Sequence, residues 1–245
     1  MPLLLLTNDD GIGAEGLRCL ERSLEGIGDI VVVAPDRERS AVSHGLTIHA
    51  PLELQKIAPD RYTLNGTPAD CVIYALAHLV NRRPDLVISG INHGANLGDD
   101  IMYSGTVAAA REASRHGIAA IAISQAYSNS NIRFDKGARF ARSLAERLLS
   151  ERANGGIYLN VNIPVRKARG VRITRQGCSL HFPHFNSLDR HETTFAENHQ
   201  RMSTIPVDYQ AIVDQYISIT PLQRDQTDYT TLPSLTKVAD SFVLS

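Results

Sequence analysis

The chain has 245 residues, enough for one large domain or one domain with an appendage, and 43% of them are hydrophobic. A net charge of −1 with no basic run longer than Arg82-Arg83 argues against a surface for duplex nucleic acid or an anionic membrane. The apolar run at the N-terminus is short and has no cationic leader, and the three cysteines, Cys19, Cys71 and Cys178, are widely spaced. These features predict a cytoplasmic protein with free thiols and no membrane association.

Apolar runs recur along the first two thirds of the chain, at residues 3–6, 30–34, 86–89, 118–124 and 157–163. Continuous rather than alternating apolar runs are typical of strands that are covered on both faces, as in a parallel sheet wrapped by helices. The sequence therefore predicts an α/β fold with a Rossmann-like, doubly wound and mostly parallel sheet.

Helix signals lie between these runs. Thr67 is a candidate N-cap that precedes a proline, and the acid Asp70 follows three positions later, ahead of apolar residues at helical spacing. A second helix is predicted to begin near residue 104 and to end at Gly117, and a third to span residues 136–149.

The pattern changes after residue 164. Residues 171–174 predict a strand, and 178–199 are polar, rich in histidine and without periodicity, which indicates a projecting loop or arm. Residues 217–222 predict a late strand, and the tail that follows has a weak pattern. We expect a core of residues 1–165 and a C-terminal extension, residues 166–245, whose late strand returns to the core.

A dinucleotide-binding motif is one interpretation of the first strand-to-helix turn. Gly11, Gly13 and Gly16 match G-x-G-x-x-G, and Asp36 lies twenty positions after the last glycine, as in NAD(P)-binding oxidoreductases. However, Asp9-Asp10 would place negative charge beside the pyrophosphate, and the sequence shows no hydride-transfer site. This alternative ranks second, because the glycines are equally explained by a tight turn.

The neighbouring carboxylates of Asp9 and Asp10 follow the first strand directly. At about 4 Å they would repel each other by ~1 kcal/mol in water and ~4 kcal/mol at an effective dielectric near 20, unless a cation intervenes. Loops rich in oxygen-bearing side chains end several predicted strands and should converge at one edge of a parallel sheet. These loops are residues 8–10, 36–43, 89–96 and 103–106. Such hard ligands favour Mg²⁺ or Mn²⁺ over zinc.

The predicted helix that begins near Ser104, Gly105 and Thr106 would turn its free N–H groups toward the same edge, which suits a phosphate. Taken singly, Ser104 or Thr106 is more often a helix cap than a ligand. A cation beside a phosphate site indicates phosphoryl chemistry by attack of an activated water. A non-catalytic module that senses nucleotides would use the same loops and remains a second alternative.

Several motifs in these loops resemble the SurE survival-protein family of metal-dependent nucleoside monophosphate phosphatases. The similarity covers most of the first 125 residues and the late strands, and the stretch from Ser89 to Val107 is its most specific part. The other matching runs are Thr7-Asn8-Asp9-Asp10-Gly11, Ala34-Pro35-Asp36-Arg37-Glu38 with Ser40 and Ser43-His44, Asn65-Gly66-Thr67-Pro68-Ala69-Asp70-Cys71, and Ser218-Ile219-Thr220-Pro221-Leu222.

The resemblance implies hydrolysis of nucleoside 5′-monophosphates, often also of 3′-monophosphates and short polyphosphate. It implies one divalent cation per subunit, Mg²⁺ or Mn²⁺, and a homodimer or homotetramer that associates through C-terminal arms. By position it makes Asp9, Asp10, Ser40 and Asn92 the metal ligands, and it places Asn96, Ser104, Gly105 and Thr106 around the phosphate. Asp9, Asp10 and Asn92 are therefore the expected catalytic residues, holding the cation while a bound water attacks phosphorus.

The chain departs from the family pattern in two places. Ala41 stands where a glycine is usual, and residues 178–199 replace a segment that usually contains a Tyr-Trp pair, although this chain has no tryptophan. Base preference is therefore left open. Cys178, His181 and His184, with His191 and His199, are an alternative zinc set, but they lack regular paired spacing. The general acid also stays open between Asp10, a water and a histidine such as His44 or His93.

Overall fold

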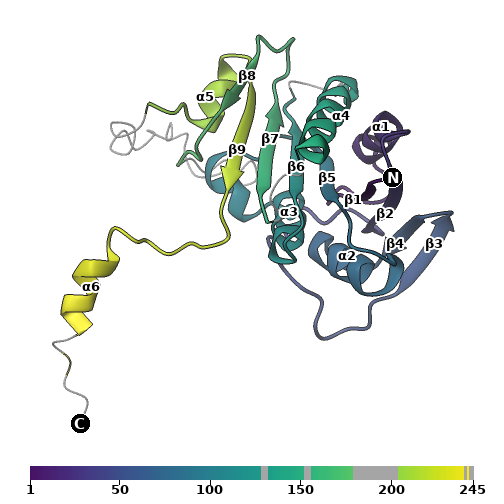
Figure 1. Cartoon of the computed structure of the whole chain (residues 1–245), viewed down its shortest axis with the longest axis horizontal. Helices are drawn as coiled ribbons and strands as arrows, with labels where there is room; N and C mark the ends of the chain where they lie inside the picture. Colours follow the sequence, from purple (N-terminus) through teal and green to yellow (C-terminus); the bar gives the residue numbers. More distant parts are fainter. Residues whose placement is uncertain (128–131, 152–155, 179–203, 240–241, 243–245) are drawn as a thin grey trace, which may run out of the picture.

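A computed structural model describes residues 1–127, 132–151, 156–178, 204–239 and 242 of the chain (Figure 1). Within them a nine-stranded sheet has the order β3-β4-β2-β1-β5-β6-β7-β9-β8. The strands are β1 (Leu3–Thr7), β2 (Asp29–Pro35), β3 (Leu54–Ala58), β4 (Arg61–Leu64), β5 (Leu86–His93), β6 (Ala120–Gln125), β7 (Tyr158–Ile163), β8 (Val171–Ile173) and β9 (Ile217–Leu222).

The sheet is mostly parallel. Strands β4, β2, β1, β5, β6 and β7 run parallel to their neighbours, whereas β3 pairs antiparallel with β4 and β9 antiparallel with β7. From β1 the chain adds β2 and the β3–β4 hairpin on one side. It then crosses to β5, which lies on the other side of β1. The predicted α/β, doubly wound fold is confirmed, and its topological switch point lies between β1 and β5.

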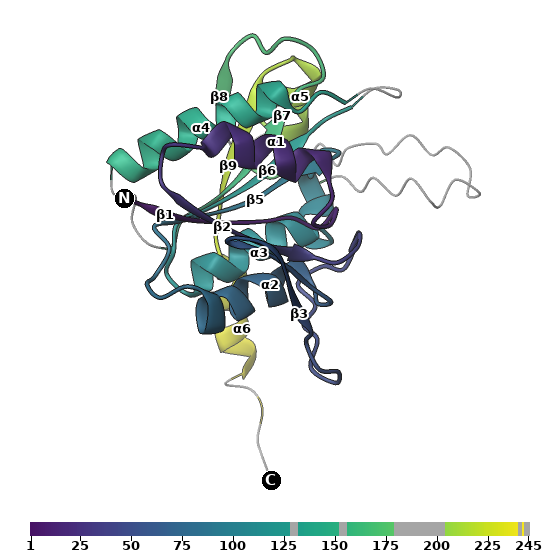
Figure 2. The ribbon, with the colours of Figure 1, turned by 90° about the vertical axis from the view of Figure 1, so that its right-hand side faces the viewer.

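Helices cover both faces of this sheet. Figure 2 shows α1 and α4 on one face and α2 and α3 on the other. The helices are α1 (Glu15–Leu24), α2 (Pro68–Tyr74), which continues as the π-helical turn η1 (Ala75–Leu79), the 3₁₀ turn η2 (Gly98–Met102), α3 (Gly105–Arg115), α4 (Asp135–Ser150), α5 (Asp208–Val213) and α6 (Leu232–Ala239).

The first strand shows why its apolar run is continuous. Leu4 and Leu6 pack into a core cluster with residues of α1 and α4, whereas Leu5 packs into a second cluster with residues of α2 and α3. Successive side chains of a strand point to opposite faces, so a strand buried on both sides needs an apolar residue at every position. Leu4, Leu5 and Leu6 are each completely buried.

The predicted helix ends are present. The Oγ1 of Thr67 accepts the Asp70 N–H at 3.1 Å, and the Asp70 carboxylate accepts the Thr67 N–H at 2.9 Å, which completes a capping box. The predicted helix at residues 136–149 is α4. At the end of α3, Gly117 has a φ of +69°, a conformation that glycine adopts without strain.

Several elements were not predicted. The β3–β4 hairpin lies at the sheet edge, and its outer strand is largely exposed, so it carries no continuous apolar run. Helix α5 is too short for a periodic signal. The tail expected after residue 222 contains α6, which extends away from the sheet (Figure 1). The predicted arm at 178–199 lies outside the described residues, apart from Cys178.

Strands β8 and β9 follow residue 165 and continue the same sheet, with β9 paired to β7. Cys19, Cys71 and Cys178 are free thiols, and burial raises the pKa of Cys71 far above its usual range. Among the helices in the described part of the chain, none is long and apolar enough to cross a membrane.

Candidate active site

Asp9 and Asp10 lie at the carboxyl end of β1, at the switch point of the sheet. The Asp9 side chain is buried, and its carboxylate is fastened to the first turn of α3. Oδ2 accepts the Thr106 N–H at 2.9 Å, and Oδ1 accepts the Thr106 hydroxyl. Two hydrogen bonds therefore join the end of β1 to the start of α3.

Gly105 is the residue that permits this approach. A Cβ at Gly105 would lie 2.9 Å from the Cβ of Asp9 and 3.0 Å from its Oδ2, and it would also meet Pro68 at 3.1 Å. Since real Cβ atoms do not approach so closely, any larger residue would push the start of α3 away from Asp9. Gly105 thus belongs to the site through its lack of a side chain.

Asp10 is tied to the neighbouring strand. Its Oδ2 accepts the backbone N–H of His93, at the end of β5, at 3.1 Å. Asn92, one residue earlier, donates its Nδ2 to Gly94 O at 2.8 Å, and its Oδ1 has no hydrogen-bond partner within the described residues. The structure therefore brings Asp9, Asp10 and Asn92 to the same sheet edge and leaves an amide oxygen available there.

The surroundings of Asp9 and Asp10 disfavour the ionised form of both carboxyl groups. Burial raises the pKa of Asp9 from 3.8 to about 6, and the charge of Asp10 adds to this, although hydrogen bonds from Thr106 oppose it. Burial also raises the pKa of Asp10, as does the charge of Glu38, while the His93 N–H opposes the shift. A cation beside the pair would stabilise both ionised forms.

The loop after β2 meets the same edge. The Arg39 N–H donates to Asp9 O at 2.7 Å, and the Arg39 guanidinium donates to Asn65 O at 2.5 Å and to Asp36 at 3.2 Å. Ser40 is exposed, and its hydroxyl donates to Glu38 Oε1 at 2.6 Å. The loop is thus bound to the acid pair through its backbone, whereas the Ser40 hydroxyl is turned toward Glu38.

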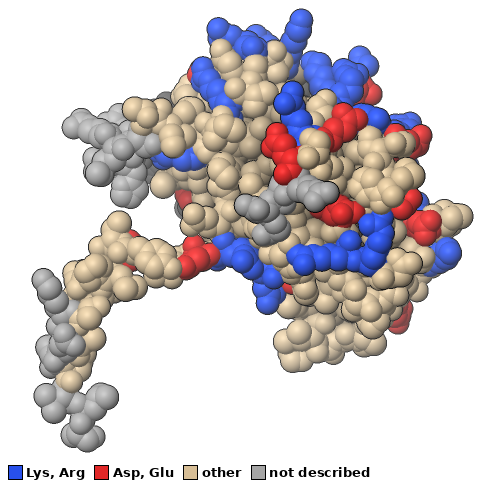
Figure 3. Space-filling model, in the orientation of Figure 1, with Lys and Arg blue, Asp and Glu red and all other residues tan. Residues whose placement is uncertain are grey.

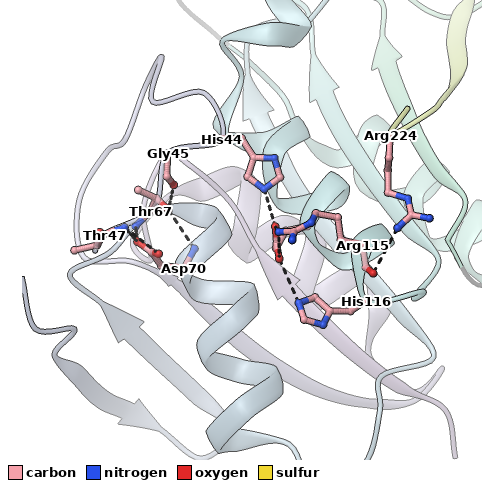
Figure 4. Close-up of polar contacts among 9 residues, drawn as sticks. His44, Gly45, Thr47, Thr67, Asp70, Arg115, His116 and Arg224 are labelled. Carbon is pink, nitrogen blue, oxygen red and sulfur yellow. Dashed lines mark hydrogen bonds and ion pairs between the residues drawn. The ribbon is translucent and has the colours of Figure 1, made fainter. Parts of the chain in front are cut away.

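The far end of this loop is held by two helices (Figure 4). His44 Nε2 lies 2.7 Å from the buried carboxylate of Glu112 on α3, and that carboxylate also binds Arg115 at 2.9 Å and His116 at 3.2 Å. His44, one of the sequence candidates for the general acid, is therefore held by Glu112 through its Nε2.

Contacts with α2 complete this anchor. The Thr47 N–H donates to both carboxylate oxygens of Asp70, at 3.1 and 3.2 Å, and the Thr67 hydroxyl donates to Gly45 O at 2.8 Å. The N-terminal capping box of α2 therefore also fixes the loop that carries Ser40.

Asn96 is buried in a network that the sequence analysis missed. Its N–H donates to Asn162 Oδ1 at 2.8 Å, and its Nδ2 donates to Ser124 Oγ at 2.8 Å. Its backbone carbonyl oxygen accepts hydrogen bonds from the Nδ2 groups of Asn160 and Asn162. Polar residues inside otherwise apolar core strands were the available signal, because buried polar groups require partners.

The first turn of α3 has fewer free donors than the sequence suggests. Ser104 caps the helix by accepting the Val107 N–H at 3.1 Å, and the Thr106 N–H is taken by Asp9. The Gly105 N–H has no partner among the described residues and remains for an anion. Gly105 and Thr106 therefore lie against Asp9, and the N–H groups of Thr106 and Val107 serve the fold.

In the part of the chain that the structure describes, no three His, Cys, Asp or Glu side chains are grouped as a metal site. The expected hard-metal set contains two acids with Ser40 and Asn92, which is compatible with this finding. The alternative zinc set falls mostly outside the described residues, since of its members only Cys178 is described, and it is exposed.

The glycine motif has a packing explanation. A Cβ at Gly16 would lie 2.0 Å from Ile91 O, so α1 approaches β5 more closely than any other residue would allow. Gly11 has a φ of +96° in the turn. Close packing and a positive φ therefore explain the glycines at positions 16 and 11 without a bound dinucleotide. This agrees with the interpretation of the motif as a tight turn.

Comparisons with known proteins agree on one family. The family model described as "Survival protein SurE" matches residues 4–181. A protein of Pelobacter propionicus named 5′-nucleotidase SurE is 41% identical over 95% of this chain and 98% of its own length. One of Syntrophotalea carbinolica with the same name is 48% identical over 71% of this chain and 70% of its own length.

A solved structure agrees as well. The crystal structure of the SurE protein from Aquifex aeolicus superimposes with a TM-score of 0.83 at 36% identity, covering 98% of this chain and all of that one. These relatives do not support the oxidoreductase alternative. A family model that spans most of the chain, together with relatives aligned over nearly its whole length, shows that this chain belongs to the SurE survival-protein family.

Proposed function

We propose that this chain is a metal-dependent 5′-nucleotidase that hydrolyses the phosphate ester of nucleoside 5′-monophosphates, with 3′-monophosphates and short polyphosphate as further substrates. One observation carries the proposal: the buried Asp9 and the partly buried Asp10 lie at the switch point, and Thr106 joins Asp9 to the start of α3. Near-full-length relatives named 5′-nucleotidase SurE support the same activity.

The residues at this edge fit a hard divalent cation. Two carboxylates whose pKa values are raised by burial, and the unpartnered Oδ1 of Asn92, form a donor set of oxygen atoms. Among the described residues, the buried Oδ1 of Asn8, beside Asp9, also has no hydrogen-bond partner. We infer that Asp9, Asp10, Ser40 and Asn92 hold one Mg²⁺ or Mn²⁺ per subunit, with the Ser40 hydroxyl released from Glu38.

When bound, the cation would neutralise charge on the phosphate and lower the pKa of a water that attacks phosphorus. Asp9 and Asp10 supply the negative charge that holds it, and Thr106 keeps the Asp9 carboxylate in one orientation. The Gly105 N–H and the positive end of the α3 dipole attract the phosphate oxygens, in the surroundings formed by Asn96, Ser104 and Thr106.

Inorganic phosphate release from AMP tests the proposal. Release with Mn²⁺ or Mg²⁺, its loss on chelation, and its recovery on adding metal are the expected results. The Asp9→Asn variant should lose the activity while its circular dichroism stays that of the wild type. The matched control is Asp29→Asn, the same change at the amino end of β2, where the exposed Asp29 carboxylate lies 3.4 Å from Arg82.

Two results would count against the proposal. Full activity of Asp9→Asn would refute the site assignment. Tight AMP binding without turnover would favour the non-catalytic sensor instead.

The assembly and organisation are further parts of the proposal. We infer a homodimer or homotetramer formed through the extension, residues 166–245, with residues 1–165 as the catalytic core and the cytoplasm as its location. Exposed apolar side chains on α6 support association through the extension: they are Leu232, Leu235 and Val238. Figure 3 shows the segment that carries them projecting from the body, with acidic side chains where it leaves the body and mostly uncharged described residues further out. Light scattering of the full chain checks the oligomeric state.

A further inference from the structure

An aromatic pair includes a residue whose backbone contacts Asp10. The rings of His93 and Tyr127 are stacked, with centroids 4.9 Å apart and an angle of 29° between their planes. The N–H of the same His93 donates to Asp10. His93, the last residue of β5, therefore contacts Asp10 through its backbone and Tyr127 through its ring.

The backbone that leads to Tyr127 is held in place. The Gly94 N–H donates to Gln125 O at 3.0 Å, which joins the β5 and β6 loops. The Gln125 side chain is buried, and its Nε2 donates to the carbonyl oxygens of Ala126, Ile163 and Pro164 at 3.2 to 3.3 Å. Tyr127 thus extends from an ordered strand end.

Tyr127 nevertheless remains 56% exposed. It also lines a cavity of about 510 Å³ at the carboxyl end of β6, whose other walls include the apolar Ile132 and Val165 and several charged residues of the start of α4 and the turn before it. The ring is therefore supported by His93, and a large part of its apolar surface is left open near a hollow. A packing role alone would bury this surface, because an exposed aromatic ring gains little from folding.

We propose that Tyr127, supported by His93, is the platform on which the nucleobase of the substrate stacks. The inference rests on the proposed nucleotidase activity and adds the group that distinguishes a nucleotide from other phosphate monoesters. A nucleotide carries its phosphate at one end and a flat base at the other. The acid pair and the Tyr127 ring, joined through His93, offer one binding surface for each end. Aromatic stacking accepts every base, so this platform selects for nucleotides without selecting strongly among them.

Substrates with and without a base test the platform. For Tyr127→Ala we expect KM for AMP to rise about tenfold, the size typical of losing one stacked base, with kcat within about twofold. KM for ribose 5-phosphate, which has no base, should stay within twofold of the wild-type value. Tyr127→Phe keeps the ring and should restore the AMP value. The matched control is Tyr229→Ala, an exposed tyrosine of the C-terminal segment.

The outcomes separate this inference from the proposed function. Equal changes in KM for both substrates, or no change for AMP, would overturn the platform. If the wild-type protein releases phosphate from neither substrate, the proposed activity fails. Calorimetric titration of AMP into the wild type and into Tyr127→Ala then tests base stacking independently of catalysis. Equal affinities would refute the platform, and a roughly tenfold loss of affinity in the variant would support it.

Discussion

Glu112 offers a quantitative test of how the loop carrying Ser40 is held. The carboxylate is 1% exposed and is surrounded by His44, Arg115 and His116 (Figure 4). Burial by itself would raise its pKa, but hydrogen bonds and charge from His44 and Arg115 outweigh burial and lower the pKa from 4.5 to about 2. The perturbation is Glu112→Gln, which keeps the shape of the side chain and mimics the protonated acid.

The sign follows from linkage. A carboxyl group whose pKa is lower in the folded state binds fewer protons there, so its contribution to the free energy of unfolding is complete above pH 4.5 and is lost as the pH falls toward 2. A shift from 4.5 to about 2 corresponds to about 3 kcal/mol at neutral pH. At pH 3 the same relation leaves about 1 kcal/mol.

Urea unfolding of the wild type and of Glu112→Gln at pH 7 and pH 3 provides the measurement. We expect the variant to be less stable by about 3 kcal/mol at pH 7 and by about 1 kcal/mol at pH 3. Other carboxyl groups titrate in the same range, but they are common to both proteins and cancel in the difference. A difference that stays constant between the two pH values would refute the reasoning.

Other consequences are open to test. Gly105→Ala should lower the rate of phosphate release from AMP by more than about tenfold, because the new Cβ would displace Asp9 from α3. The control is Gly13→Ala, where a Cβ meets nothing within 4 Å, and its rate should match that of the wild type. Ala41 has a φ of +54°. Ala41→Gly should therefore raise the free energy of unfolding by about 0.5–1 kcal/mol, since ~1–2 kcal/mol of strain exceeds the entropy cost of glycine; a lower urea midpoint would contradict this. Leu5→Ala, at a fully buried position, should cost about 2–5 kcal/mol by the same assay, and a loss below 1 kcal/mol would contradict its core placement.

The sequence was sufficient for the main elements because their signals are local. Continuous apolar runs identified the central strands, and the Thr67–Asp70 capping box marked the start of α2. The β3–β4 hairpin was missed because an exposed edge strand needs few apolar residues. Helix α6 was missed because the tail that contains it shows little periodic pattern and, within the described residues, the helix packs on no core cluster.

For the site, the sequence determined which residue types stand at the strand ends, and the order of a parallel sheet requires those ends to meet. Asp9, Asp10 and Asn92 were predicted to meet in this way, and the structure brings them to one sheet edge. Their hydrogen-bond partners could not be predicted, since these depend on side-chain direction and on contacts between distant segments. Thr106 was expected beside a phosphate, but the structure binds it to Asp9, which is 97 positions away in the chain.

The same distinction applies to the supporting residues. Nothing near Glu112 in the sequence indicates that its carboxylate receives His44, and nothing near Tyr127 indicates that its ring lies on His93. Local sequence determined the central strands, the caps and the acidic pair, because neighbouring residues specify them. The tertiary structure alone decided which loops hold that pair and which ring lies beside it, because long-range packing sets the distances between groups far apart in the chain.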